Sequence, residues 1–126
     1  ANYLSDFVKP LYPYYWDQKE VIEKNFLGKN SNATIFSADD ITSELSEFFL
    51  NFETGNLKFF PIDSAKVNND GNLYYLLNRG LNPASGKKAD SLLKKNNDNS
   101  IILVDRKNNV FLYQVNNNIL QTLKKN

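Results

Sequence analysis

Residues 100–123 read SIILVDRKNNVFLYQVNNNILQTL, and their pattern of apolar runs and polar breaks is the clearest indication of the fold. Three apolar runs lie within this stretch: residues 101–104, 110–115 and 119–123. Clusters rich in Asn separate the runs, and Asn suits tight turns because it tolerates positive φ. Short apolar runs between such clusters are typical of strands. The stretch therefore predicts a three-stranded antiparallel meander.

The first run, residues 101–104, contains no polar residue, which predicts a central strand that is covered on both faces. The second run carries apolar side chains on both of its faces. One face has Phe111, Tyr113 and Val115, and the other has Val110 and Leu112. A meander with two apolar faces is not stable alone in water, so the rest of the chain must cover it.

Composition limits the chemistry that this chain can perform. The 126 residues include no Cys and no His, which excludes disulfides, thiolate nucleophiles, structural zinc and the Ser-His-Asp class of hydrolases. Fifteen basic and 14 acidic residues leave a net charge of +1, so there is no electrostatic argument for binding nucleic acid. We therefore expect a protein that is not an enzyme and that uses no metal and no cofactor.

The chain also lacks Met, and no apolar stretch approaches the roughly 20 residues that span a bilayer. From the missing Met we expect a soluble part of a longer, exported precursor, in which a signal or a membrane anchor lies upstream. Its abundance of Asn and Lys suggests a bacterial source with an AT-rich genome. The expected location is the periplasm or cell envelope, with the cytoplasm as the alternative.

Two helices are expected before the sheet. Asp17 is a good N-cap for the first, which Gly28 ends, and Ser37 caps the second, which Gly55 ends. Residues 29–34 between the two helices are expected to be a polar loop.

Further strands are expected at residues 57–62 and 72–78, which pair with each other, and Pro61 marks an edge or an end. A helix over residues 89–95 separates this pair from the meander. A short helix is also expected at residues 4–9, ahead of Pro10.

Together these elements predict one α+β domain over residues 1–126. Its single antiparallel sheet would have about five strands, with N-terminal helices largely on one face and one helix inserted between strands two and three. The order of elements resembles that of PAS-like and Cache-like sensor domains and of roadblock or profilin-like modules. An NTF2-like fold is the alternative. The resemblance implies a fold and leaves the function to be argued from a site.

The densest aromatic patch lies near the start of the chain, and such residues are common at binding hot spots. The predicted partner-binding residues are Tyr12, Tyr14, Tyr15 and Trp16, with Tyr74, Phe111 and Tyr113 lining a groove beside them. The alternative is that this patch pins the N-terminal segment to the core, because aromatic side chains usually bury large areas.

Residues 79–88 resemble a phosphate-binding loop only in part. Five residues separate Gly80 from Gly86 instead of four, and Lys88 stands where that loop needs a hydroxyl. A nucleotide-hydrolysing site is therefore not expected. A weaker site remains, in which Arg79, Lys87 and Lys88 hold a small anion at the start of the following helix.

Two functions follow from these patterns. The first is a protein-binding or assembly module of a bacterial envelope or secretion-type complex, which binds a partner or a second copy through the aromatic patch. The alternative is an extracytoplasmic sensor of a small anionic ligand held near Arg79. No spacing of carboxylates singles out a catalytic pair.

Overall fold

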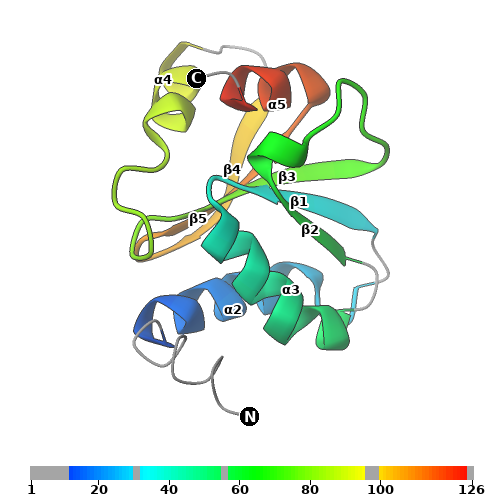
Figure 1. The fold of residues 1–126 in the computed structure, drawn as a ribbon, viewed down its shortest axis with the longest axis vertical. Coiled ribbons are helices and arrows are strands. Elements are labelled where there is room, and N and C mark those ends of the chain that lie inside the picture. The colour runs from blue at the N-terminus through cyan, green and yellow to red at the C-terminus, as the bar shows by residue number, and fades with distance from the viewer. Residues whose placement is uncertain (1–11, 30–31, 55–56, 96–99, 125–126) are drawn as a thin grey trace.

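The computed structural model describes residues 12–29, 32–54, 57–95 and 100–124 (Figure 1). The helices are α2 (Tyr12–Phe26), α3 (Asp40–Thr54), α4 (Lys87–Lys95) and α5 (Asn117–Lys124), with a short 3-10 helix, η2 (Ile62–Ser64). The strands are β1 (Ala33–Ser37), β2 (Leu57–Pro61), β3 (Asn72–Asn78), β4 (Ile101–Lys107) and β5 (Val110–Val115). The protein is an α+β domain in this described part. The short helix predicted at residues 4–9 lies outside it, as does Gly55.

The five strands form one mixed sheet in the order β2-β1-β3-β5-β4. Strand β1 runs parallel to both β2 and β3, whereas β5 runs antiparallel to both β3 and β4. The prediction of a fully antiparallel sheet was therefore wrong, although the number of strands was right. It was also wrong that residues 57–62 pair with residues 72–78, because β1 lies between them.

Strand β1 was missed because it is short and contains polar residues. Residues 29–34 were predicted to be a loop and Ser37 a helix cap, but Ile35 and Phe36 are buried on opposite faces of the sheet. The cap of α3 is Asp39, whose Oδ1 accepts a hydrogen bond from the backbone N–H of Thr42 at 2.9 Å. Helix α3 then supplies the crossover that a parallel β1–β2 pair requires.

The third predicted strand of the meander is instead helix α5. The side chain of Asn116 accepts a hydrogen bond from the backbone N–H of Ile119 at 2.9 Å, which is an N-cap interaction. Ile119, Leu120 and Leu123 then form a buried stripe at helical spacing. An Asn-rich cluster can begin a helix as well as make a turn, and here it begins a helix.

The predicted hairpin of β4 and β5 is confirmed. Asn108 in its turn has a positive φ of 53°, as expected for Asn at such a position. Strand β4, however, lies at the edge of the sheet and not at its centre. Ile101 is buried, but the apolar side chains that follow it are partly exposed.

Helices cover both faces of the sheet, so the expectation that they lie largely on one face was wrong. Figure 1 shows α2 and α3 on one side of the sheet and α4 and α5 on the other. On the α2/α3 face the core includes Val21, Ile22, Phe26, Ile35, Phe59, Leu76 and Leu112. On the α4/α5 face it includes Phe36, Tyr75, Leu77, Ala89, Phe111, Tyr113 and Leu120.

The first helix begins at Tyr12, five residues before the predicted cap at Asp17. Pro13 is compatible with this early start, because the first turn of a helix does not need the N–H group that proline lacks. Gly28 follows the helix with a φ of 73°, which is the backbone conformation expected for a glycine after a helix end.

Candidate binding sites

Helix α2 divides the predicted aromatic patch. Tyr15 is buried, whereas Tyr14 and Trp16 are exposed, and the side chain of Tyr12 lies outside the described residues. Residues two apart on a helix do not face each other, so Tyr14 and Trp16 do not form one platform. The ring of Tyr14 packs on Gly80, where an added Cβ would overlap it.

The other predicted partner-binding residues do not line a common groove. Phe111 and Tyr113 are buried in the core of the α4/α5 face. Tyr74 lies on the opposite face, where its ring meets that of Phe26 edge-on at 4.9 Å between centroids. The structure therefore does not bring Tyr74 together with Phe111 and Tyr113.

A buried polar cluster holds the turn that follows β3. Gln18, which is fully buried, donates to the backbone oxygen of Thr42 at 3.0 Å and to the hydroxyl of Ser46. Its Oε1 accepts a hydrogen bond from Asn78 at 3.0 Å. Asn78 in turn accepts a hydrogen bond from the backbone N–H of Gly80 at 3.1 Å. Helices α2 and α3 thus determine where the loop of residues 79–86 begins.

Arg79 supports this loop from within. Its guanidinium donates to the backbone oxygens of Ser85 at 3.1 Å and Gly86 at 3.3 Å, and pairs with Asp90 at 2.7 Å. It also lies over the ring of Phe111, 4.7 Å from the centroid. Arg79 was predicted to bind a ligand, but its described contacts tie the loop to helix α4.

The other two predicted anion-binding residues line a cavity of about 320 Å³, which we call the basic cavity. Its lining consists of Ala38, Ile62, Asp63, Tyr75, Asn82, Ala84, Ser85, Gly86, Lys87, Lys88, Leu123 and Lys124. Lysines from α4 and α5 therefore meet at one place, although they are far apart in the sequence. Lys124 could not be found by its spacing, because only the packing of α5 brings it there.

The basic cavity lies beside the carboxyl ends of two parallel strands. Ala38 follows β1 directly, and residues 82–86 belong to the loop that follows β3. From β1 the chain crosses to β2 on one side, while β3 lies on its other side. In open sheets with parallel strands, ligands commonly bind where neighbouring connections diverge in this way.

Tyr75 is the polar side chain at the inner wall of the basic cavity. It is only 4% exposed, and no described residue forms a hydrogen bond with its hydroxyl. Burial, together with the negative charge of Asp39, raises the pKa of Tyr75 well above its ordinary value. The phenol is therefore neutral at physiological pH and can donate a hydrogen bond.

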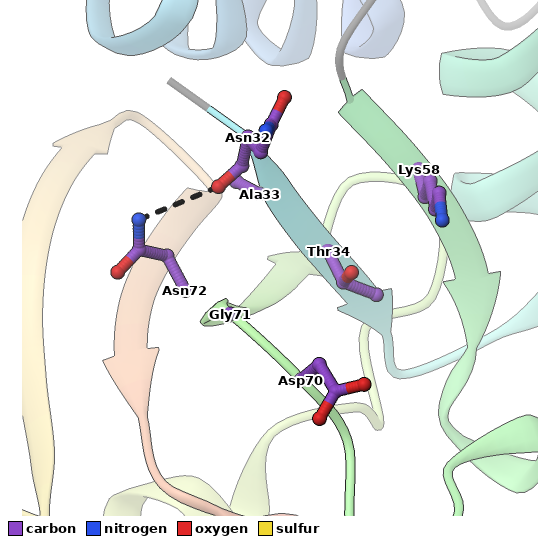
Figure 2. A pocket seen from close by; sticks show the side chains of 7 residues that line it. All are labelled: Asn32, Ala33, Thr34, Lys58, Asp70, Gly71 and Asn72. Atoms are coloured by element: carbon purple, nitrogen blue, oxygen red, sulfur yellow. Dashed lines mark hydrogen bonds between the residues drawn. The ribbon is translucent and has the colours of Figure 1, made fainter.

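A second cavity lies at the opposite, amino ends of the parallel strands (Figure 2). It has a volume of about 450 Å³, and the side chain of Asn72 donates to the backbone oxygen of Asn32 at 3.3 Å across its rim. Its charged residues, Lys58 and Asp70, have opposite signs. The lining therefore favours neither an anion nor a cation.

Strand β4 carries three consecutive apolar side chains at the free edge of the sheet. Ile102, Leu103 and Val104 are 40%, 45% and 41% exposed. Ile102 pairs with Gln114 and Leu103 with Tyr113, so their side chains lie on opposite faces of the sheet. The register with β5 shifts at Val104, which is typical of a β-bulge. We call residues 102–104 the β4 edge.

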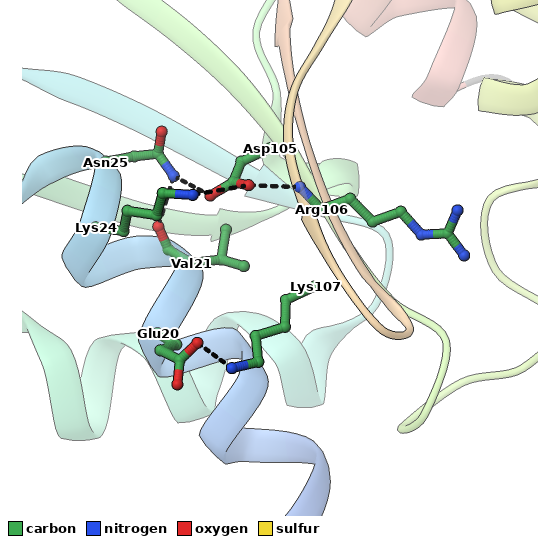
Figure 3. A network of polar contacts seen from close by, with 7 residues as sticks. All are labelled: Glu20, Val21, Lys24, Asn25, Asp105, Arg106 and Lys107. Atoms are coloured by element: carbon green, nitrogen blue, oxygen red, sulfur yellow. Dashed lines mark hydrogen bonds and ion pairs between the residues drawn. The ribbon is translucent and has the colours of Figure 1, made fainter.

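The second half of β4 is attached to helix α2 (Figure 3). The carboxylate of Asp105 accepts a hydrogen bond from Asn25 at 2.8 Å and lies 3.7 Å from the ammonium of Lys24. Lys107 pairs with Glu20. Partial burial raises the pKa of Asp105. Its hydrogen bonds with Asn25 and with the backbone N–H of Arg106, and the charge of Lys24, together lower that pKa below its ordinary value. Contacts with α2 therefore hold residues 105–107 and leave residues 102–104 at the free edge.

Within residues 12–29, 32–54, 57–95 and 100–124, no three His, Cys, Asp or Glu side chains gather as a metal site would require. None of the helices in these ranges is long and apolar enough to cross a membrane.

Comparison with known proteins found no family model, no curated protein and no solved structure that matches this chain. Its function is therefore inferred from the geometry of the β4 edge and the basic cavity.

Proposed function

We propose that this protein is a non-enzymatic docking module that binds an extended segment of a partner protein along the β4 edge. The observation that carries the proposal is the row of three exposed apolar side chains on a strand whose only neighbour in the sheet, among the described residues, is β5. An extended segment can add to such an edge as a further strand, through main-chain hydrogen bonds and side-chain packing on both faces.

The other edge of the sheet provides an internal comparison. Strand β2 carries an exposed lysine, Lys58, and ends in Pro61, and both features discourage the pairing of another strand. Charged residues on β4 begin only at Asp105, after the apolar row. The bulge at Val104 is the only protective feature within that row. The β4 edge should therefore accept an added strand more readily than the β2 edge.

The apolar side chains of the β4 edge can supply a useful binding free energy. Burying a large aliphatic side chain completely is worth about 1.5–3 kcal/mol, and each of these three is a little under half exposed. Covering all three would therefore contribute about 2–4 kcal/mol before main-chain hydrogen bonds are counted. This contribution suits a docking contact that also needs specific pairing.

This proposal keeps the predicted function and changes the surface that performs it. The sequence pointed to an uncovered sheet face beside the N-terminal aromatic residues. Because helices lie on both faces, the argument from an uncovered face no longer holds. The edge strand replaces it as the place where a partner would bind.

Selection from a library of displayed linear peptides, followed by NMR mapping of the bound peptide, tests the proposal. We expect selected peptides to perturb residues 101–104 and the paired residues of β5, and Leu103→Lys to abolish their binding. Lys58→Glu on the opposite edge is the matched control and should bind normally. Peptides that bind equally well to Leu103→Lys, or that perturb a different surface, would refute the proposal.

Sedimentation velocity distinguishes binding of a partner protein from self-association of this chain. We expect a monomer at micromolar concentration for the natural sequence. A dimer that Leu103→Lys dissociates would assign the edge to self-association and overturn the partner-docking proposal.

A further inference from the structure

We propose that the basic cavity binds a small organic phosphate, with the phosphate group at the amino end of α4 and the organic part against the apolar wall. This site is separate from the β4 edge and does not depend on the docking proposal.

The charge of the lining favours a dianion. Three lysines, Lys87, Lys88 and Lys124, line the basic cavity, and Asp63 is the one carboxylate among the lining residues, which leaves a net charge of +2. A phosphate monoester carries nearly two negative charges at neutral pH. A monocarboxylate would leave one of these positive charges uncompensated.

The backbone of α4 adds directed hydrogen-bond donors. The backbone N–H of Asp90 bonds to the oxygen of Gly86, which makes Gly86 the last residue before the helix. The N–H groups of Lys87, Lys88 and Ala89 therefore have no acceptor within the helix. An anion at this position accepts these donors and interacts favourably with the helix dipole.

A carboxylate in the first turn of α4 could compete for these donors. Asp90 is that carboxylate, but Arg79 pairs with it at 2.7 Å. The ion pair neutralises Asp90 and holds the loop of residues 79–86 against the helix. Among the described residues, this arrangement leaves Lys87 and Lys88 as the unpaired charged groups at the amino end of α4.

Tyr75 is an independent indication of a ligand. The side chain is only 4% exposed and lines the basic cavity, and no described residue forms a hydrogen bond with its hydroxyl, which is therefore available to a ligand in the cavity. A phosphate oxygen or a ligand hydroxyl would satisfy it. A ligand that binds both the amino end of α4 and the phenol of Tyr75 must extend across the basic cavity to the sheet.

The carboxylate whose negative charge acts on this phenol, Asp39, lies outside the lining of the basic cavity. Its Oδ1 accepts hydrogen bonds from the backbone N–H and the hydroxyl of Thr42, at 2.9 and 2.8 Å. Oδ1 thereby caps α3, whereas Oδ2 is buried without a hydrogen-bond partner among the described residues.

The remaining lining explains why an organic phosphate suits the site better than inorganic phosphate. Ile62 and Leu123 contribute apolar surface, and Asn82 and Ser85 contribute polar groups at the loop. A volume of about 320 Å³ lies within the range of small-molecule sites, which begins at about 300 Å³. A short carbon chain or ring can fill the part that the phosphate leaves.

Calorimetric titration with glycerol 3-phosphate and with inorganic phosphate tests the proposal. We expect saturable binding of both, with glycerol 3-phosphate binding more tightly. Sodium chloride at the same ionic strength is the control for general screening. In NMR spectra, the amide signals of residues 86–89 should shift most.

Two double variants separate site binding from general attraction. Lys87→Ala with Lys88→Ala should weaken glycerol 3-phosphate binding by about tenfold or more, since two charge-assisted contacts are lost. Lys94→Ala with Lys95→Ala removes the same charge from the far end of the same helix and should leave the affinity nearly unchanged. Tyr75→Phe removes only one oxygen and should weaken binding about 2- to 10-fold.

Three results would overturn the proposal. The first is equal weakening by the two double variants, which would show only nonspecific attraction to a basic surface. The second is unchanged affinity in Tyr75→Phe. The third is an absence of saturable binding by either probe in the intact protein. None of these results bears on peptide binding at the β4 edge, so the two proposals fail separately.

Discussion

Replacing Gln18 should be one of the most damaging single changes among the polar residues of this protein. Gln18→Met keeps a side chain of similar size and removes the amide. It thereby removes hydrogen bonds to Thr42 and Ser46 and the bond from Asn78. Each such bond contributes about 0.5–1.5 kcal/mol net, so the free energy of unfolding should fall by about 2–4 kcal/mol.

The loss should not be larger, because the former partners keep other contacts. Asn78 still donates to the backbone oxygen of Tyr14 at 3.1 Å. The remaining cost comes from polar groups left buried without their full set of partners. If the loss exceeded this range, the variant would have disturbed the packing of α2 on α3 as well.

Urea unfolding followed by circular dichroism measures this effect. Gln114→Met is the matched control, because Gln114 is exposed on β5, and it should change the free energy of unfolding by no more than about 0.5 kcal/mol. A double-mutant cycle of Gln18→Met with Asn78→Ala should give a coupling of about 1 kcal/mol. A loss below about 1 kcal/mol in Gln18→Met, or no coupling, would refute the role assigned to this cluster.

Three further predictions follow from single residues. Because burial raises the pKa of Tyr75, the unfolded chain loses this proton first as the pH rises above about 10, so stability should fall there. Tyr75→Phe should remove that part of the fall in pH-dependent urea unfolding, and an unchanged slope would contradict the assignment. Because the pKa of Asp105 is lowered, its stabilising contribution is present above the unfolded pKa of about 4 and is lost as the pH falls through the lowered folded pKa. Asp105→Asn should therefore lose about 0.5–1 kcal/mol at pH 7 and much less at pH 2–3, whereas Asp70→Asn, which is exposed, should show no such difference. Gly80→Ala should lower the free energy of unfolding by about 1–3 kcal/mol through overlap with the ring of Tyr14, and unchanged thermal unfolding would exclude that contact.

Local features of the fold were predictable because local chemistry determines them. The β4–β5 hairpin follows from an Asn turn between two apolar runs, and Asn108 does adopt positive φ. Gly28 ends α2 for a similar reason. Helix α4 was predicted to within two residues of its start. Each of these features depends on residues within one turn of one another.

The predictions of other elements were wrong because the same local sequence pattern fits two structures. The run at residues 119–123 is apolar enough for a strand, but the cap that Asn116 provides and packing against the α4/α5 face make it a helix. The residues of β1 resemble a loop until β2 and β3 supply hydrogen-bonding partners on both sides. Neither choice is visible without the neighbouring elements.

The candidate sites show the same division. Lys87 and Lys88 were found from the sequence because they follow a glycine at the start of a helix. Tyr75 and Lys124 were missed, since nothing near them in the chain indicates a cavity. Residues 102–104 were noticed as apolar, but they were assigned to the centre of the sheet instead of its edge.

By itself, the sequence determined three things: the absence of Cys and His chemistry, the β4–β5 hairpin, and the approximate positions of three helices. Only the tertiary structure decided the direction and order of the strands, the exposed edge at β4, and the meeting of three lysines with Tyr75. The physical reason is the separation along the chain of the residues that interact. Turn and cap preferences act over a few residues, whereas strand neighbours and cavities arise from contacts between residues that are far apart in the chain.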